Sequence, residues 1–343
     1  MTIYYVTFLF LFIVGFIYER LQLKKGAEIF IIASILLVML VIFGFRHEVG
    51  VDWFNYIRVY ERHVGDAWSF STPEIAYKYL NVFSDMLGTG IVGVIFVSTL
   101  LLLLFSFAAP YRLGINPFYY MALVAPYHLV VSGMNLTRQS IAISIFIFAV
   151  TYLLQKRKLL YAFWIFAASM FHFSAILMLG FLFIDFKKRY LIPPLLFIVI
   201  PLLAVALKFY DQYLDTEMQN AGLILRVGFL FPAALLILAH KKKWIKMDLI
   251  RFRLCLVTVL MAPGLLVASL LSTTMADRFS YYFIVLAALL IMEQVIKSKR
   301  RSFDLMTYAS PLLCVTAMVA FLIWHMGSGY IPQYEFQHLF SQK

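Results

Sequence analysis

Charged residues are scarce in this chain. Of its 343 residues only 13% are charged, whereas 63% are hydrophobic, and the mean hydropathy is +0.89. A typical soluble domain carries roughly 25% charged residues, so the composition excludes a soluble or disordered protein. Apolar runs recur along the whole chain, and a membrane-spanning helix needs about 20 mainly apolar residues. The sequence therefore predicts an all-α polytopic membrane protein, with residues 1–343 as a single integral membrane domain and no soluble domain.

Cysteine is nearly absent as well. Cys255 and Cys314 both lie inside apolar runs, which indicates neither a disulfide framework nor a thiolate metal site. The chain also lacks a Walker sequence, a glycine-rich phosphate loop after a strand and an HExxH motif, so we expect no cofactor and no metal. No internal repeat is recognisable, which counts against an inverted-repeat transporter.

The apolar runs predict about 11 or 12 transmembrane segments. The first run, 3–18, is followed by a basic cluster at 20–25 and preceded by no basic residue, the reverse of a cleavable signal peptide. Between the basic clusters 156–158 and 187–189 the chain is too short for two full spans, so we expect a short hairpin that turns near His172. The remaining spans are predicted at 28–45, 92–109, 117–134, 138–154, 191–208, 222–239, 254–271, 279–295 and 306–325.

The distribution of charge predicts the topology. With basic loops in the cytoplasm, both termini face outward and residues 46–90 form a long outer loop with short helices. The cytoplasmic loops then hold 20 of the 29 basic and 6 of the 17 acidic residues, a net charge of +14 inside against −2 outside. The formal net charge of +12 is therefore explained by orientation and by attraction to anionic membrane lipid, and no nucleic-acid partner is expected.

Four arginines are predicted at the outer membrane boundary, the side that the positive-inside rule depletes of basic residues. A charged side chain costs roughly 2.5 to 3.5 kcal/mol at the centre of a spanning helix and less near an interface. Snorkelling to the headgroups explains any one of them, but four together favour a shared anionic ligand. Guanidinium groups bind phosphate oxygens through paired hydrogen bonds, so a lipid diphosphate fits this chemistry. The four are Arg46, Arg138, Arg226 and Arg278.

Three residues are candidate acid–base groups. Asp52 and Glu74 are carboxylates of the predicted outer loop, and His172 lies at the predicted hairpin turn. A neutral imidazole can act as a base or as a hydrogen-bond donor. Two structural alternatives remain open: Glu74 is also a natural first-turn helix residue, and a lone histidine among aromatics is ordinarily a core residue.

Aromatic residues near these groups are candidates for sugar contacts. Tyr56 and Tyr281 are consistent with stacking on a sugar ring, although the aromatic belts of membrane interfaces explain them equally well. Asp277 is expected to pair with the adjacent Arg278.

Six short pieces of sequence carry a resemblance to a known family. They are GFRHEVGVDWFNY, PEIAYKYL, NLTRQSIAISI, FHFSAIL, LILRVG and DRFSYYF, in this order along the chain. As a set they resemble the EpsG/Wzy family of bacterial polysaccharide polymerases. The positions that match the family's motifs are Arg46, Gly50, Asp52, Tyr56, Glu74, Arg138, Gln139, His172, Ser174, Arg226, Arg278 and Tyr281 or Tyr282.

The resemblance implies an integral membrane glycosyltransferase. It would join oligosaccharide repeat units carried on undecaprenyl diphosphate, as both donor and acceptor, at the outer face of the bacterial cytoplasmic (inner) membrane. The product would be O-antigen, capsule or exopolysaccharide, and a chain-length regulator and a flippase are further candidate partners. Gln139, with Tyr56 and Tyr281, would contact the sugar.

The motif residues and the physical reasoning suggest one mechanism. The four arginines would bind the donor diphosphate and stabilise the charge that develops on it. A carboxylate or His172 would remove the proton from the acceptor hydroxyl; we rank Glu74 first, Asp52 second and His172 third. No metal is needed for this chemistry, although two outer carboxylates could recruit Mg²⁺.

Three other functions use similar chemistry. A flippase for lipid-linked oligosaccharides would also need arginines for a diphosphate, but with charges at the membrane midplane or on both sides of a cavity. An O-antigen ligase would transfer the chain to a lipid A core, and the sequence does not distinguish the acceptor. A membrane acyltransferase would need an acyl carrier that enters from the cytoplasm. The concentration of arginines on the outer side favours the polymerase.

Overall fold

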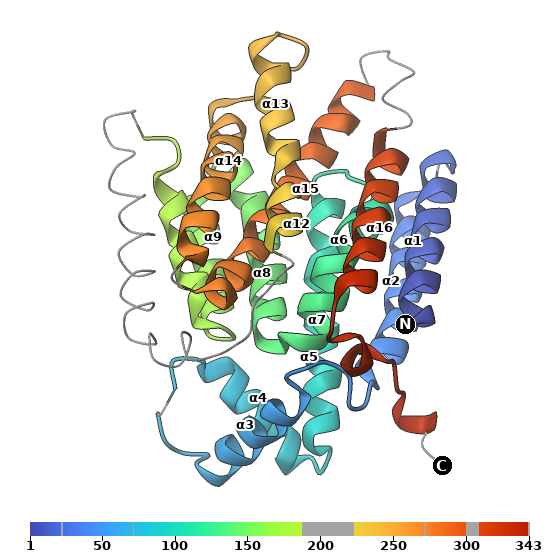
Figure 1. The fold of residues 1–343 in the computed structure, drawn as a ribbon, viewed down its shortest axis with the longest axis vertical. Coiled ribbons are helices and arrows are strands. Elements are labelled where there is room, and N and C mark those ends of the chain that lie inside the picture. Colours follow the sequence, from blue (N-terminus) through green and yellow to red (C-terminus); the bar gives the residue numbers. More distant parts are fainter. Residues whose placement is uncertain (22, 71, 187–222, 271, 300–308, 342–343) are drawn as a thin grey trace. The chain divides into compact units, whose positions relative to one another are not determined.

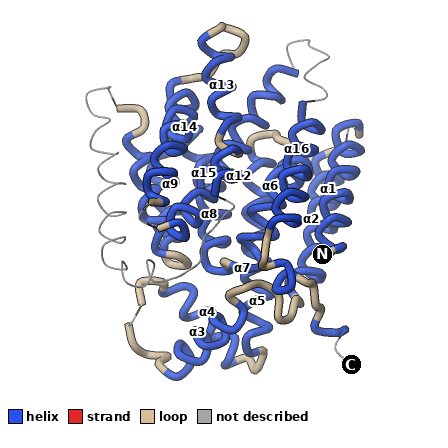
Figure 2. The backbone as a smooth tube through the Cα atoms, in the orientation of Figure 1, coloured by secondary structure: helices blue, strands red, loops and turns tan. Residues whose placement is uncertain are grey.

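The computed structural model describes residues 1–343 except 22, 71, 187–222, 271, 300–308 and 342–343. Within that part of the chain every regular element is a helix (Figure 1, Figure 2). The predicted all-α fold is confirmed.

Seven helices of the described residues are long and apolar enough to cross a membrane. Each overlaps a predicted span, because an uninterrupted apolar run of this length satisfies its backbone as a helix in lipid. The chain is therefore a multi-pass membrane protein. The seven are α1 (Thr2–Arg20), α2 (Lys25–Gly44), α5 (Gly90–Arg112), α8 (Thr137–Leu154), α14 (Leu249–Ser269), α15 (Thr273–Lys299) and α16 (Ala309–Gly327).

The span predicted at 117–134 is helical but irregular. α6 (Pro117–Val124) continues into the wider π-helix η1 (Ala125–Ser132) and the short α7 (Gly133–Asn135). Pro126 has no N–H to donate, so the regular α-helical hydrogen bonds are interrupted at this point.

The predicted hairpin is confirmed. Its arms are α9 (Lys158–Ser169) and the 3₁₀ helix η2 (Phe173–Phe183), and the chain turns between them near His172. The Tyr161 hydroxyl on the first arm donates a hydrogen bond to the carbonyl of Met178 on the second (2.5 Å).

The span predicted at 222–239 is divided into two helices, α12 (Leu223–Gly228) and α13 (Phe231–Lys241). Pro232 occupies the second position of α13, where its missing N–H is not needed, whereas one continuous helix would lose a hydrogen bond there. The span predicted at 191–208 lies outside the described residues.

The chain divides into two compact units. Unit 1 comprises Met1–Phe148, Trp164–Ala175 and Pro311–Lys343, and unit 2 comprises Ala149–Phe163 and Ile176–Ser310. The single membrane domain expected from the sequence stays a prediction.

Unit 1 has two distinct ends because α2 and α5 pack against each other in opposite directions. Near one end the Tyr111 hydroxyl donates to the carboxylate of Glu28 (3.4 Å). Toward the other end Arg46 donates to the hydroxyl of Thr99 (2.9 Å). The segment 46–90 lies at this second end (Figure 1).

Two short helices fill the segment between α2 and α5. They are α3 (Trp53–Gly65) and α4 (Ile75–Met86), which pack against each other, and α4 also packs against α5. Tyr56 and Tyr77, with ring centroids 6.3 Å apart, form a buried cluster with Val94 of α5. This cluster fixes the helix pair on the end of the unit, and with it the beginning of α4.

In unit 2, α15 is the central, largely buried helix and packs against α12, α13 and α14. Toward its C-terminal end Glu293 accepts two hydrogen bonds from Arg251 of α14 (2.7 and 2.6 Å). In its first turns Asp277 pairs with Arg226 of α12. The two ion pairs therefore mark opposite ends of α15.

Candidate active site

The beginning of α4 is attached to the turn of the hairpin in unit 1. The N–H groups of Ala76 and Tyr77 both donate to the carbonyl of Met170 (3.0 and 3.3 Å). Free N–H groups in the first turn of a helix require such acceptors. Because Met170 precedes His172 by two residues, this contact brings the start of α4 to the histidine.

Glu74 is the residue immediately before α4, and its carboxylate accepts hydrogen bonds from two other segments. One oxygen, Oε1, lies 2.7 Å from Nδ1 of His172 and accepts the N–H of Phe173 (3.3 Å). The other oxygen, Oε2, accepts from the guanidinium of Arg138, at the start of α8. The Glu74 side chain is only 8% exposed, whereas those of Arg138 and His172 are 27% and 23% exposed. The cluster is thus a buried carboxylate between two partly accessible cationic or polar groups.

These contacts determine the charge of Glu74. Burial alone would raise the pKa of this carboxyl, but the hydrogen bond and electrostatic attraction of His172, the charge of Arg138 and the Phe173 N–H outweigh it and lower the pKa to about 2. Glu74 is therefore ionised at neutral pH.

An ionised carboxylate can only accept hydrogen bonds. Since Nδ1 of His172 faces Glu74 Oε1, Nδ1 must carry a proton. In the neutral ring the other nitrogen, Nε2, is then a proton acceptor. The structure thus pairs a carboxylate with an imidazole in the tautomer that a general base requires.

Two tyrosine rings lie near the guanidinium of Arg138. The central carbon of its guanidinium lies 5.8 Å from the ring centroid of Tyr56 and 5.7 Å from that of Tyr77. Cation–π contacts of this kind stabilise a guanidinium and restrict its orientation. Tyr56 is buried in this contact, so its predicted sugar contact stays a prediction.

His63 of α3 is a neighbour that sequence reasoning did not select. Its ring lies 6.1 Å from that of Tyr77 in an edge-on arrangement. Burial, with the nearby charges of Arg138 and Lys78, lowers the pKa of His63 to about 4, so it is neutral at neutral pH. The sequence did hold a signal for His63: it follows Tyr56 by seven residues, a spacing that places both side chains on one face of a helix.

Arg46 occupies a buried position in the same unit. Nη1 donates to the carbonyl of Phe43 (3.1 Å) and the hydroxyl of Thr99 (2.9 Å), and Nη2 donates to the carbonyl of Gly133 (3.0 Å) and the hydroxyl of Thr137 (3.3 Å). Through these hydrogen bonds the guanidinium connects four helices, α2, α5, α7 and α8. Its predicted contact with a diphosphate stays a prediction.

The turn after Arg46 packs closely on the chain before α8. Gly50 has a φ angle of +103°, and a Cβ at this position would collide with the carbonyl oxygen of Met134. The backbone N–H of Asp52 donates to Oδ1 of Asn135 (2.7 Å). Glycine is required here for both its conformation and its size.

Asp52 and Gln139, two further predicted site residues, lie at helix starts in unit 1. Asp52 directly precedes α3 and is partly exposed, whereas Gln139, in the first turn of α8, is buried. Their predicted roles as base and sugar contact stay predictions.

The other two predicted arginines belong to unit 2. Arg226 pairs with Asp277 and lies over the buried ring of Tyr281, 5.3 Å from its centroid. The sequence suggested that Asp277 pairs with Arg278, but adjacent residues on a helix point in different directions, and the partner is Arg226. The proposed meeting of all four arginines stays a prediction, as does the sugar contact of Tyr281.

Comparison with known protein families assigns the chain to a family. A model of the EpsG family matches residues 28–337, nearly the whole chain. The chain belongs to the EpsG family. Its members are associated with Wzy-like polysaccharide polymerases, which supports a polysaccharide polymerase-like role. No curated protein and no solved structure shows significant similarity to the chain.

In this EpsG family member the acidic, basic and imidazole groups that meet in unit 1 come from three separate motifs. Glu74 belongs to PEIAYKYL, Arg138 to NLTRQSIAISI and His172 to FHFSAIL. No three His, Cys, Asp or Glu side chains gather as potential metal ligands within the described ranges; the expectation of a metal-free site stays a prediction.

Proposed function

We propose that this protein is a polysaccharide polymerase that joins oligosaccharide units carried on undecaprenyl diphosphate at the outer face of the bacterial cytoplasmic membrane. The observation that carries the proposal is the contact of Glu74 with both Arg138 and His172, in a multi-pass membrane protein of the EpsG family. The cluster combines a positioned base with a cation, the two groups that glycosyl transfer from a diphosphate requires.

In the proposed reaction His172 is the base. Its Nε2 removes the proton from the acceptor hydroxyl as the hydroxyl oxygen bonds to the anomeric carbon of the donor. Glu74 is a positioning residue: it holds the imidazole through Nδ1 and stabilises the imidazolium that forms. This assignment reverses the order suggested by the sequence, because a carboxyl group with a pKa of about 2 is a weak base at neutral pH.

Arg138 has the complementary role. As the bond between the anomeric carbon and the diphosphate oxygen breaks, negative charge builds up on the leaving diphosphate. The partly exposed guanidinium of Arg138 would stabilise that charge electrostatically. In the same proposal no metal ion takes part.

The outward orientation is supported by the ends of unit 1. Glu74, Arg138 and His172 lie at the end that carries α3 and α4, whereas Lys25 and Arg112 lie at the opposite end of α2 and α5. Basic residues collect on the cytoplasmic side of membrane proteins. The end with the cluster is therefore proposed to face outward.

Purified protein in liposomes tests this function. Supplied with oligosaccharide on undecaprenyl diphosphate, it should release undecaprenyl diphosphate and form lipid-linked products of two or more units, with or without EDTA. Transfer of the substrate across the bilayer without its consumption would instead identify a flippase. Loss of activity in EDTA that returns with Mg²⁺ would contradict the metal-free mechanism alone.

A further inference from the structure

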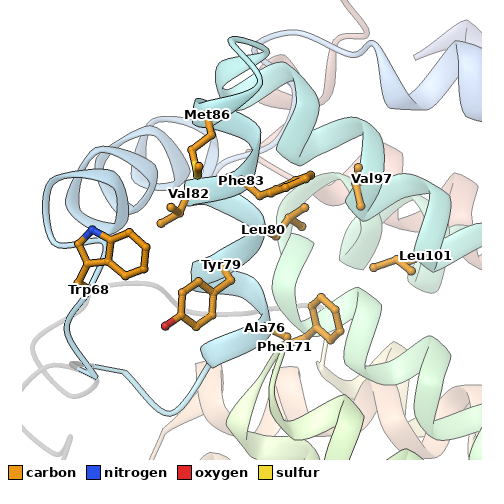
Figure 3. A pocket seen from close by; sticks show the side chains of 10 residues that line it. All are labelled: Trp68, Ala76, Tyr79, Leu80, Val82, Phe83, Met86, Val97, Leu101 and Phe171. Atoms are coloured by element: carbon orange, nitrogen blue, oxygen red, sulfur yellow. The ribbon is translucent and has the colours of Figure 1, made fainter.

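An apolar groove lies beside the candidate active site in unit 1. It encloses about 500 Å³ between α4, the first half of α5 and the hairpin turn (Figure 3). Apolar side chains make up nearly all of its surface. They include Leu80 and Phe83 of α4, Val97 and Leu101 of α5, and Phe171 before His172.

The position of the groove indicates that it contacts lipid. One wall belongs to α5, which is long and apolar enough to cross the membrane. The other wall is formed by α4, which lies at the end of the unit. Large apolar side chains at its edge are exposed, including Trp68 (84%), Met86 (73%) and Phe83 (61%). Exposed apolar surface of this extent marks a binding site or contact with a membrane.

Two residues of the groove wall are close in sequence to members of the polar cluster. Ala76 and Phe171 lie side by side in its wall (Figure 3); Ala76 follows Glu74 by two residues, and Phe171 directly precedes His172. Phe171 also packs against the buried cluster around Tyr77, which contacts Arg138. The apolar groove therefore lies next to the segments that hold the guanidinium and the imidazole.

We propose that the groove holds the hydrocarbon chain of the donor, a single long polyprenyl chain whose diphosphate lies at Arg138. This assignment rests on the proposed function. A polyprenyl diphosphate combines one apolar chain with an anionic head. The apolar groove matches the chain, and the guanidinium of Arg138 beside it matches the diphosphate. The chain enters between α4 and α5 from the lipid, so the head is delivered beside His172.

Photo-crosslinking tests the site without requiring turnover. A polyprenyl diphosphate with a diazirine in its hydrocarbon chain is incubated with the full protein in phosphatidylglycerol liposomes and irradiated. Labelled peptides should come from the groove walls, and an excess of unlabelled polyprenyl diphosphate should suppress the label. Label that persists under this competition would assign the groove to phospholipid, and label confined to other helices would place the chain elsewhere; either result overturns the proposal.

A matched pair of variants on α5 provides the control. Leu101→Trp fills the groove, whereas Leu104→Trp places the same side chain on an exposed position of α5 that does not line the groove. Leu101→Trp should reduce the label that unlabelled polyprenyl diphosphate suppresses by about tenfold, because about two methylene groups of the bound chain lose their burial. Leu104→Trp should not reduce it. If Leu101→Trp does not fold, Val82→Trp on α4 makes the same test. Equal labelling of the folded groove and control variants would contradict the proposal.

Turnover separates this inference from the proposed function. Specific label in the groove without chain growth would overturn the polymerase function and retain the lipid site. Chain growth with the label on other helices would retain the polymerase function and overturn the lipid site. In an active protein, KM should be lower for a long-chain donor than for a short-chain donor, and Leu101→Trp should remove this difference.

Discussion

Glu74 Oε1 and His172 Nδ1 are 2.7 Å apart although the two residues are separated by 98 positions in the sequence. The contact depends on the docking of α4, whose first N–H groups bond to the carbonyl of Met170 in the hairpin turn. The same carboxylate binds Arg138. One buried acid therefore sets both the tautomer of the imidazole and the position of the guanidinium.

Arg138→Lys should abolish most activity while leaving the protein in the membrane. Lysine keeps the charge but not the planar group that contacts Glu74 and lies near two tyrosine rings. We expect polymer synthesis per amount of protein to fall by roughly 10²-fold or more, the scale reported when one electrostatic donor is lost from an active site. Arg58→Lys, on an exposed position of α3, is the control. Equal activity of both variants would reduce Arg138 to an anchoring role.

Gly50→Ala should destabilise unit 1. The positive φ angle and the nearby carbonyl of Met134 both exclude a Cβ, so we expect a loss of about 2 kcal/mol or more in the free energy of unfolding. Gly65→Ala is the matched control, because no atom lies within 4 Å of a Cβ built there. Thermal unfolding in detergent measures both. A Gly50→Ala melting temperature equal to that of the control would contradict the packing of this turn.

The ionisation of Glu74 predicts a pH dependence of stability. Its pKa falls from 4.5 to about 2 on folding, so its contribution is complete above about pH 4.5 and is lost as the pH falls toward 2. The contribution amounts to up to about 3 kcal/mol, since one pKa unit corresponds to about 1.4 kcal/mol. Glu74→Gln should be less stable at neutral pH and should lose less stability between about pH 5 and pH 2. Parallel pH curves for the two proteins would contradict the assigned ion pair.

The spans were largely predictable because an apolar run of sufficient length has few alternatives in lipid. The exceptions occur at prolines: Pro126 lies in a π-helix and Pro232 begins a separate helix. The members of the cluster were predictable as motif residues, but their partnership was not, because it depends on a backbone contact with Met170. Arg46 illustrates the same limit, since an arginine bound to neutral acceptors and one that binds a phosphate look alike in sequence.

The proposed topology predicts opposite labelling of two introduced cysteines. The native Cys255 and Cys314 are buried and can be replaced by alanine. In intact cells, with the outer membrane permeabilised where one is present, Glu48→Cys should react with a membrane-impermeant thiol reagent and Lys243→Cys should not. Both side chains are exposed, so accessibility within the protein does not explain a difference. Labelling of Lys243→Cys alone would reverse the orientation and move the active site to the cytoplasmic side.

The central claim is that His172, oriented by Glu74, accepts the proton in glycosyl transfer. His172→Asn tests it most directly, because the asparagine amide can still donate to Glu74 from a position close to that of Nδ1 but has no counterpart of Nε2. The measurement is the rate of chain growth in liposomes at saturating donor, with thermal unfolding as the check on folding. We predict a rate roughly 10²- to 10⁴-fold below that of the unmodified protein, at nearly unchanged stability. A folded His172→Asn protein that extends chains at the normal rate would contradict the account.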